Sequence, residues 1–264
     1  MRKWSGHGGQ AGIRDHCAMG STLSTDRVQA VLARLRRTGE GEDEPAKLRV
    51  RDREAELGDK VYGAERAALG AQAPLSITPA AGKLLYALTI AVQPSLIVEF
   101  GTSLGYSTIH FASALQDLGS GSIITTELLA DKARLAARNV ADAGLSGCVE
   151  IRHGNALGTL ADLDTDVDLL FLDGSNDLYI SVLELVEPRL TARALIVADM
   201  SHQEPHHARY REYVNDPSRG YLTTEIPIDA GIVVSTQDPA SARDRVSPAS
   251  GQARSSGASG ATAH

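Results

Sequence analysis

The chain has 264 residues, which is enough for one sizeable α/β domain with additional terminal segments. Its formal net charge is −7 and only 4% of its residues are aromatic. Both values argue against a nucleic-acid partner, because nucleic acids select concentrated positive charge and aromatic stacking surfaces. No apolar run reaches the roughly 18–20 residues of a membrane span, and the N-terminus lacks the apolar core of a secretory signal. With two cysteines, Cys17 and Cys148, a structural disulfide is not expected, so we expect a cytoplasmic protein.

The N-terminal quarter of the chain divides into two parts. Residues 1–22 have no hydrophobic periodicity, and we expect a disordered extension. Residues 23–74 are expected to be helical: Ser24 or Thr25 caps a first helix, and a charged stretch continues as an exposed helix after Pro45. The charged stretch is either a solvated face or a lid or dimer arm over an active site. The apolar stripe of the first helix either packs on the core or supports a homodimer; it comprises Val28, Val31, Leu32 and Leu35.

Residues 75–236 alternate between apolar runs suited to buried strands and segments with helical periodicity. Five such repeats predict a doubly wound, mostly parallel sheet, and two closing strands joined by a hairpin-like turn add an antiparallel edge, for seven strands in all. The expected strands are 96–100, 122–127, 149–152, 167–172, 194–198, 223–228 and 232–235. The expected helices are 26–37, a charged one within 40–57, 79–92, 106–118, 131–143, 155–163, 178–190 and 205–215. Residues 237–264 are rich in Ser, Ala and Gly, and we expect a disordered tail.

The strand at 96–100 ends in a glycine turn that contains Glu99, Gly101 and Gly105. Strand, glycine turn and helix form the opening of a nucleotide-binding unit, because the glycines allow close backbone approach and the helix N-terminus offers free N–H groups. The phosphate-binding pattern GxxxxGK[ST] is absent. The dinucleotide pattern GxGxxG lacks its third glycine, which disfavours an NAD-dependent oxidoreductase. Glu99 is a poor neighbour for a pyrophosphate but suits a ligand with an amino group and a sulfonium, such as S-adenosylmethionine.

A second carboxylate, Glu127, closes the next predicted strand. At the carboxyl end of that strand, its side chain can accept hydrogen bonds from both hydroxyls of a ribose. This feature alone does not separate a methyl donor from NAD, but Glu99 and the missing third glycine do.

Four segments resemble class I S-adenosylmethionine-dependent O-methyltransferases of the catechol and caffeoyl-CoA type, in their bacterial branch. They are LSITPAAG at 75–82, VEFGTSLGYST at 98–108, TTEL at 125–128, and the pair LDGSNDLY at 172–179 and IVADM at 196–200. The resemblance implies a Rossmann-like methyltransferase fold. It also implies transfer of a methyl group from S-adenosylmethionine to a hydroxyl of a small-molecule acceptor.

The resemblance further implies a set of cofactor residues. At the methionine end of the cofactor, Glu99 and Gly101 form the floor, Ile77 the cover, and Ser103 and Ser107 the hydroxyl partners of the amino and carboxylate groups. At the other end Glu127 binds the ribose, with Leu128 and Asn155 beside the adenine and Asp173 beside the sulfonium. With Gly105 of the turn, the implied set is Ile77, Glu99, Gly101, Ser103, Gly105, Ser107, Glu127, Leu128, Asn155 and Asp173.

In the resembled family, Asp173 and Asp199 correspond to carboxylate ligands of Mg²⁺, which binds the acceptor oxygens, and a lysine takes the proton. Here Asn176 stands where that lysine is expected. Met200 stands where a further oxygen donor is expected, and a thioether is a poor ligand for a hard cation. Mg²⁺ is therefore expected only if Asp173 and Asp199 suffice to bind it. His202 is a candidate to replace the lysine as general base, and Asp173, Asp199 and His202 together are the candidate catalytic residues. Two alternatives stay open: a metal-independent methyltransferase acting on another nucleophile, and a protein that binds S-adenosylmethionine without methyltransferase activity.

Overall fold

The structure of the chain, a computed structural model, describes residues 20–200 and 205–238. The predicted extension and tail lie almost wholly outside these ranges, as do Cys17 and His202. Within the described ranges, no helix combines the length and apolarity that crossing a membrane requires.

A single seven-stranded sheet forms the centre of the fold, with strand order β3-β2-β1-β4-β5-β7-β6. Strand β7 runs antiparallel to both of its neighbours, and the remaining pairs are parallel, which confirms the predicted fold class. The strands are β1 (Leu96–Phe100), β2 (Ser122–Glu127), β3 (Val149–His153), β4 (Val167–Leu172), β5 (Leu190–Asp199), β6 (Tyr221–Ile226) and β7 (Ile232–Gln237).

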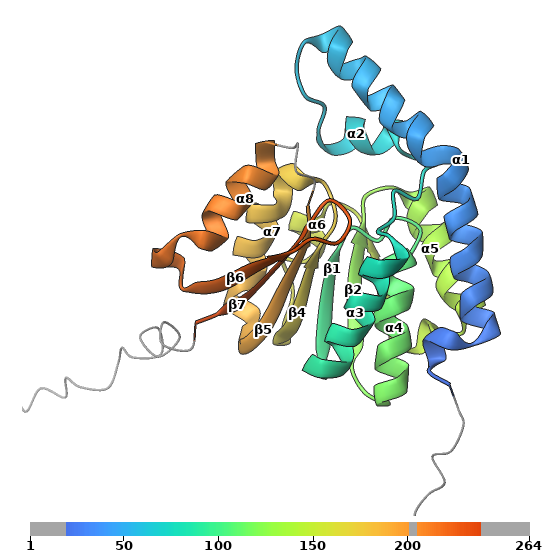
Figure 1. The fold of residues 1–264 in the computed structure, drawn as a ribbon, viewed down its shortest axis with the longest axis vertical. Coiled ribbons are helices and arrows are strands. Elements are labelled where there is room, and N and C mark those ends of the chain that lie inside the picture. The colour runs from blue at the N-terminus through green and yellow to red at the C-terminus, as the bar shows by residue number, and fades with distance from the viewer. Residues whose placement is uncertain (1–19, 201–204, 239–264) are drawn as a thin grey trace, which may run out of the picture.

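Helices cover both faces of the sheet, with α3, α4 and α5 on one side and α6, α7 and α8 on the other (Figure 1). Each side buries its own hydrophobic cluster against the sheet, as expected for a doubly wound fold. The helices are α1 (Asp26–Leu57), α2 (Gly63–Leu69), α3 (Pro79–Val92), α4 (Tyr106–Leu118), α5 (Ala130–Ala143), α6 (Ala156–Thr159), α7 (Tyr179–Val186) and α8 (Pro205–Asn215).

Several elements differ from their predicted bounds, among them α6, which is shorter than the predicted 155–163. Helix α1 is continuous through Pro45, because Ala46 directly after it is buried and tertiary packing supports the helix there. Helix α2 was not predicted. Helix α7 ends early because Pro188 has no N–H for the next turn, and β5 therefore starts at Leu190. The closing strands shift because Ile228 belongs to the turn between them: its N–H donates to the Ile226 carbonyl.

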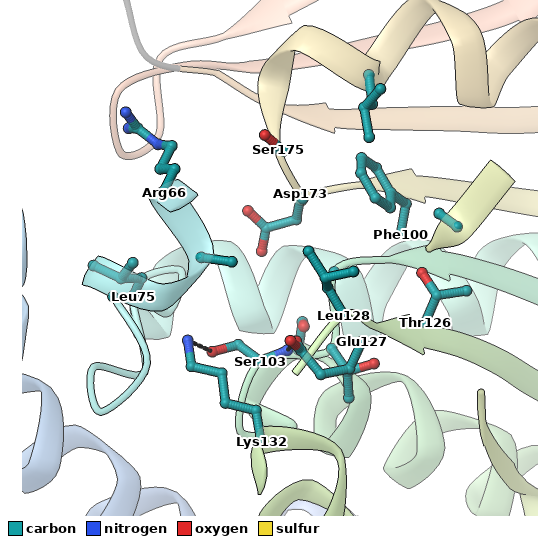
Figure 2. A pocket seen from close by; sticks show the side chains of 18 of the residues that line it. Arg66, Leu75, Phe100, Ser103, Thr126, Glu127, Leu128, Lys132, Asp173 and Ser175 are labelled. Atoms are coloured by element: carbon teal, nitrogen blue, oxygen red, sulfur yellow. Dashed lines mark hydrogen bonds between the residues drawn. The ribbon is translucent and has the colours of Figure 1, made fainter. Parts of the chain in front are cut away.

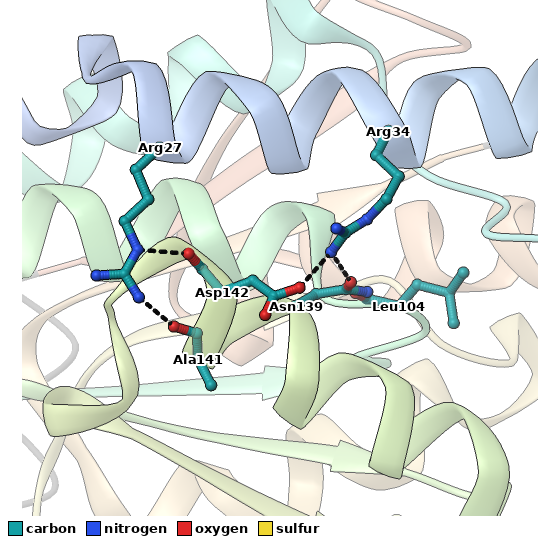
Figure 3. A network of polar contacts seen from close by, with 6 residues as sticks. All are labelled: Arg27, Arg34, Leu104, Asn139, Ala141 and Asp142. Carbon is teal, nitrogen blue, oxygen red and sulfur yellow. Dashed lines mark hydrogen bonds and ion pairs between the residues drawn. The ribbon is translucent and has the colours of Figure 1, made fainter.

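The first half of α1 packs on the core of its own chain. The predicted apolar stripe is buried in the same cluster as residues of β1 and α4. Of the two roles expected for it, the stripe therefore packs on the core and does not form a dimer contact. Arg27 and Arg34 fasten α1 to the C-terminal end of α5 (Figure 3). Arg27 donates to the Ala141 and Asp142 carbonyls at 2.8 and 2.5 Å, and Arg34 lies 2.7 Å from the Asp142 carboxylate. The rest of α1 extends beyond the sheet and packs against α2 (Figure 1).

Candidate functional site

A cavity of about 370 Å³ opens at the carboxyl ends of β1, β2 and β4. Helix α2 and residues 74–77 form its cover, and the glycine turn after β1 forms its floor (Figure 2). Ligands of doubly wound folds bind at this edge of the sheet. Eight of the predicted cofactor residues line it: Ile77, Gly101, Ser103, Ser107, Glu127, Leu128, Asn155 and Asp173.

Glu99 and Gly105 lie behind the cavity wall instead of on it. Glu99 is fully buried and accepts hydrogen bonds from the hydroxyls of Ser107 and Thr108; burial raises the pKa of its carboxyl group. Gly105 is the left-handed N-cap of α4, with φ +87°, and packs toward Ala136 of α5. Both residues support the turn from below, because the strand buries Glu99 inside the fold and the helix cap turns Gly105 toward α5.

Gly101 allows the ends of β1 and β4 to meet. Its φ is +103°, and a Cβ atom there would lie 2.5 Å from the main-chain oxygen of Asp173. The Asp173 N–H donates to the Phe100 carbonyl at 2.9 Å, and the N–H of Thr102 donates to the Thr126 carbonyl at 2.9 Å. The turn is thus held on both sides by neighbouring strands.

The nucleoside end of the cavity is built around Glu127. Its two carboxylate oxygens accept hydrogen bonds from the backbone N–H groups of Ser103 and Leu129, each at 2.9 Å. Burial raises the pKa of this carboxyl group, and the Leu129 N–H and the Lys132 ammonium oppose that shift. Each oxygen keeps acceptor capacity for a further donor. The arrangement suits a pair of ribose hydroxyls.

Asn155 lines the cavity and also caps α6. Its carbonyl oxygen accepts a hydrogen bond from the Leu157 N–H at 2.9 Å. Its amide nitrogen is then a donor that can serve a ligand in the cavity. Leu128, 37% exposed, supplies an apolar surface on the cavity wall.

The two serines predicted to contact the methionine end already have partners. The Ser103 hydroxyl donates to the Pro74 carbonyl and the Ser107 hydroxyl to Glu99. Ser103 also has φ +48°, a backbone conformation that non-glycine residues rarely adopt and that is common at ligand sites. Both hydroxyl oxygens still have acceptor capacity.

Three carboxyl groups, those of Asp173, Asp199 and Asp229, lie near one another, and of these Asp173 lines the cavity. Asp173 and Asp199, at the ends of β4 and β5, are within hydrogen-bonding range of each other. Burial, and then the charge of Asp199, raises the pKa of Asp173 well above its usual range. Burial, and then the charge of Asp229, raises the pKa of Asp199 to about 6. Asp229 lies in the turn between β6 and β7 and accepts hydrogen bonds from the N–H and hydroxyl of Thr78.

The described donor set does not fit a hard divalent cation. Met200 is 1% exposed and packs in the core beside α8, so it contributes nothing to the cavity. Within residues 20–200 and 205–238, no group of three or more His, Cys, Asp or Glu side chains is placed to hold a metal ion. Of the ligand positions that the resemblance implies, the described residues supply the carboxylates of Asp173 and Asp199, and Met200 supplies no oxygen donor. His202 lies outside the described residues, so its predicted role stays a prediction.

Three features of the site were not predicted from the sequence. Lys132 lines the cavity although it follows a strand end by one helical turn, where a lysine is typically solvated. Helix α2 covers the cavity with Gly63, Ala64 and Ala67, whose small side chains carry no chemical signal. Asp229 looked like an ordinary turn residue. Each of these positions depends on contacts between segments that are distant in the sequence.

A seven-stranded sheet in this order, with a glycine turn after β1 and an acidic residue at the end of β2, is the architecture of a class I methyltransferase domain. Residues 98–200 match a family profile described as a methyltransferase domain. Two curated relatives are both named catechol O-methyltransferase. The one from Niastella koreensis is 35% identical over 129 residues, covering 47% of this chain and 58% of the relative. The one from Mycobacterium tuberculosis is 30% identical over 126 residues, covering 47% and 56%. The chain thus matches a little over half the length of these relatives.

Solved structures share the fold. The O-methyltransferase TomG from Streptomyces achromogenes, solved in complex with SAM, superimposes with a TM-score of 0.57 at 23% identity, covering 75% of this chain and 99% of TomG. An O-methyltransferase from Bacillus cereus in complex with SAH gives 0.56 at 21% identity, covering 79% and 97%. The resemblance predicted from the sequence, to class I O-methyltransferases of the catechol type, is confirmed by these matches.

Proposed function

We propose that the chain binds S-adenosylmethionine in this cavity and transfers its methyl group to a hydroxyl of a small molecule. The observation that carries the proposal is the placement of one carboxylate at each end of a single cavity, with the glycine turn between them. Glu127 suits the ribose, and Asp173 suits the sulfonium and the ammonium group. The names of the relatives, and the cofactors named for the solved neighbours, support the same assignment.

S-adenosylmethionine supplies a methyl carbon bound to positively charged sulfur. In the proposed reaction the acceptor oxygen forms a bond to that carbon while the carbon–sulfur bond breaks and its electron pair stays on sulfur. This chain aligns the two partners and excludes water, for which α2 provides the cover. Asp199, whose pKa of about 6 lies near the range that suits a general base, takes the hydroxyl proton.

The cofactor half of the proposal is tested by calorimetry with S-adenosylhomocysteine and with NAD. We expect saturable binding of the first compound and none of the second. Glu127→Ala should weaken that binding by at least about tenfold, since it removes a charged acceptor of two hydrogen bonds. Tight NAD binding would contradict the methyl-donor assignment, and unchanged affinity in Glu127→Ala would contradict the ribose assignment.

The acceptor half is tested by screening phenols and catechols for methylated products by mass spectrometry, with and without Mg²⁺. We expect a product from at least one phenolic compound. A second candidate function is favoured by Asn176 and Met200, which replace the family's lysine and oxygen donor. It is binding of S-adenosylmethionine without methyl transfer, or metal-independent transfer to another nucleophile. Binding without any product across hydroxyl, amine and thiol acceptors would favour the first of these.

The proposal includes a cytoplasmic location and a small-molecule acceptor, without a nucleic-acid partner. The net charge of −7 supports the last point. A homodimer stays a hypothesis for analytical ultracentrifugation, and it would need a surface other than the stripe of α1 buried in the core.

A further inference from the structure

Lys132 is a cation in the wall of a cavity that is proposed to bind a cationic ligand. It lies in the first turn of α5, and only 7% of its surface is exposed. Its side chain reaches up past the glycine turn, and Nζ lies 3.2 Å from the Ser103 hydroxyl (Figure 2). A positive charge here can serve either the carboxylate on the amino-acid tail of S-adenosylmethionine or an anion of the protein itself, and the contacts of Lys132 favour an anion of the protein.

That anion is Glu127. Lys132 faces its carboxylate and, more distantly, the carboxylate of Asp43 on α1. Burial lowers the pKa of Lys132, and the charges of Glu127 and then Asp43 oppose the shift. The ribose and adenine of the proposed ligand carry no negative charge, so nothing in that half of the ligand pairs with an ammonium group. The lysine therefore acts on the protein.

The lysine meets a junction of three segments. Ser103 donates its backbone N–H to Glu127 at 2.9 Å and its hydroxyl to the Pro74 carbonyl, while its own backbone is held at φ +48°. The next residue of the cover, Leu75, donates its N–H to Asp43 at 2.9 Å. Lys132 thus contacts Ser103, the residue that is hydrogen-bonded both to the Glu127 carboxylate and to the Pro74 carbonyl of the cover.

We propose that Lys132 is a positioning residue for the nucleoside end of the cavity: it holds the Ser103 turn and the Glu127 carboxylate in the orientation that receives a ribose diol. This inference rests on the proposed function. Lys132 acts on ligand affinity through Glu127, so its contribution depends on the ribose hydroxyls and not on the amino-acid tail of the ligand.

The test uses the full chain and three ligands: S-adenosylhomocysteine, 5′-methylthioadenosine, which lacks the amino-acid tail, and 2′-deoxy-5′-methylthioadenosine. Lys132→Met removes the charge and keeps the length, and Lys132→Arg restores the charge. Arg134→Met is the matched control, because Arg134 lies on the same helix with its side chain 71% exposed in an ion pair with Asp131. Affinities are measured by calorimetry, and folding by thermal unfolding.

We expect Lys132→Met to weaken both ribose-containing ligands about tenfold and Lys132→Arg to regain most of the loss, as for a charge-assisted contact. The 2′-deoxy ligand keeps one hydroxyl for Glu127, so its affinity should fall clearly less in Lys132→Met than the affinity of the ribose ligands does. Arg134→Met should match the wild type throughout. Combining Lys132→Met with Glu127→Gln should add little to the loss of Glu127→Gln alone, because the two residues act as one unit.

Three outcomes overturn the positioning role while leaving the proposed function intact. They are unchanged binding in Lys132→Met, a loss for S-adenosylhomocysteine but not for methylthioadenosine, and an equal loss for the ribose and 2′-deoxy ligands. Failure of the wild type to bind any of the three overturns the proposed function as well. If Lys132→Met does not fold, Lys132→Arg decides the question, with an expected loss of about threefold for the ribose ligands and a smaller loss for the 2′-deoxy ligand.

Discussion

The α-carbon of Gly101 faces the main-chain carbonyl of Asp173 so closely that no side chain fits between them. An added Cβ atom would lie 2.5 Å from that oxygen and 2.7 Å from its carbonyl carbon. The glycine is therefore required by the protein's own backbone at the junction of β1 and β4, in addition to any approach of a ligand. Asp173 stands at the acidic end of the cavity, so this junction sets its position.

Gly101→Ala should weaken S-adenosylhomocysteine binding by about a hundredfold or more, because backbone atoms on both sides of the clash cannot rotate away. Gly119→Ala is the control: its φ is also positive, +70°, but nothing lies within 4 Å of the added atom. It should cost only about 1–2 kcal/mol of stability and leave the affinity unchanged. Calorimetry and urea unfolding measure the two effects, and equal affinities for both variants would contradict this account.

Gly82→Ala should destabilise the fold by about 2 kcal/mol, since the added methyl would lie 2.5 Å from Nε2 of the buried His110 ring. The ring cannot move freely, because its Nδ1 lies 2.8 Å from the Tyr106 carbonyl. The double variant Gly82→Ala/His110→Ala lacks the ring that the added methyl would meet. Its loss in free energy of unfolding should therefore be smaller than the sum of the losses in the two single variants. Gly41→Ala, in α1 with open space around it, should instead stabilise by up to about 1 kcal/mol.

His110 should make stability fall in mild acid. Burial is the largest cause that lowers its pKa from the ordinary 6.5 to about 4, with the charge of Lys83 adding to it against the Tyr106 hydrogen bond. Between those values the unfolded chain binds a proton that the folded chain does not. The free energy of unfolding therefore decreases as the pH falls from 6.5 to 4, by on the order of 3 kcal/mol. His110→Asn should flatten this slope in urea titrations across that range; an unchanged slope would assign it to other groups.

Asn139 links α1 to the glycine turn. Its amide donates to the Leu104 carbonyl at 2.9 Å and accepts from Arg34 at 2.8 Å (Figure 3). Asn139→Leu leaves a buried carbonyl without its donor, and we expect a loss of about 2 kcal/mol in urea unfolding and a several-fold loss in S-adenosylhomocysteine affinity. Arg134→Ala on the same helix, whose ion pair is exposed, should change stability by less than about 0.5 kcal/mol.

Chelation should leave the protein's properties unchanged. Because the described donors at Asp173 and Asp199 do not complete a site for a hard cation, EDTA should alter neither the affinity for S-adenosylhomocysteine nor methyl transfer to a phenol. The measurement is calorimetry and product formation before and after chelation. Loss of activity that Mg²⁺ alone restores would show a metal site completed by residues outside the described ranges.

The periodic elements of the sheet and of α4 were predictable from the sequence because their signals are local. Helix α4 spans the predicted 106–118, since Gly105 and Gly119 both take the left-handed conformation that begins and ends it. Thr78 caps α3 as its position before Pro79 indicates. Glu127 was placed at the cavity because strand ends of parallel sheets converge. Neighbours in the sequence decide the bounds of α3 and α4, and the general geometry of parallel sheets decides the position of Glu127.

The remainder of the site depends on segments that meet only in the folded chain. Whether Glu99 faces a ligand or the core is decided by Ser107 and Thr108, which turn its carboxylate inward. Lys132 lies in the first turn of a helix, where a lysine is typically solvated, yet it is buried in the cavity wall and contacts Ser103 of the glycine turn. No periodicity or motif carries that information.

The contact between Thr78 and Asp229 joins residues 151 positions apart. As the chain leaves the ribosome, Thr78 lacks this partner until the turn before β7 emerges, although the glycine turn and β2 have already been made. The β6–β7 hairpin, the last to be synthesised, therefore holds Thr78, the residue that directly follows residues 74–77 of the cover. A chain released before residue 229 would carry every predicted cofactor residue and still lack the hydrogen bonds that hold Thr78, the residue that follows the cover of the cavity.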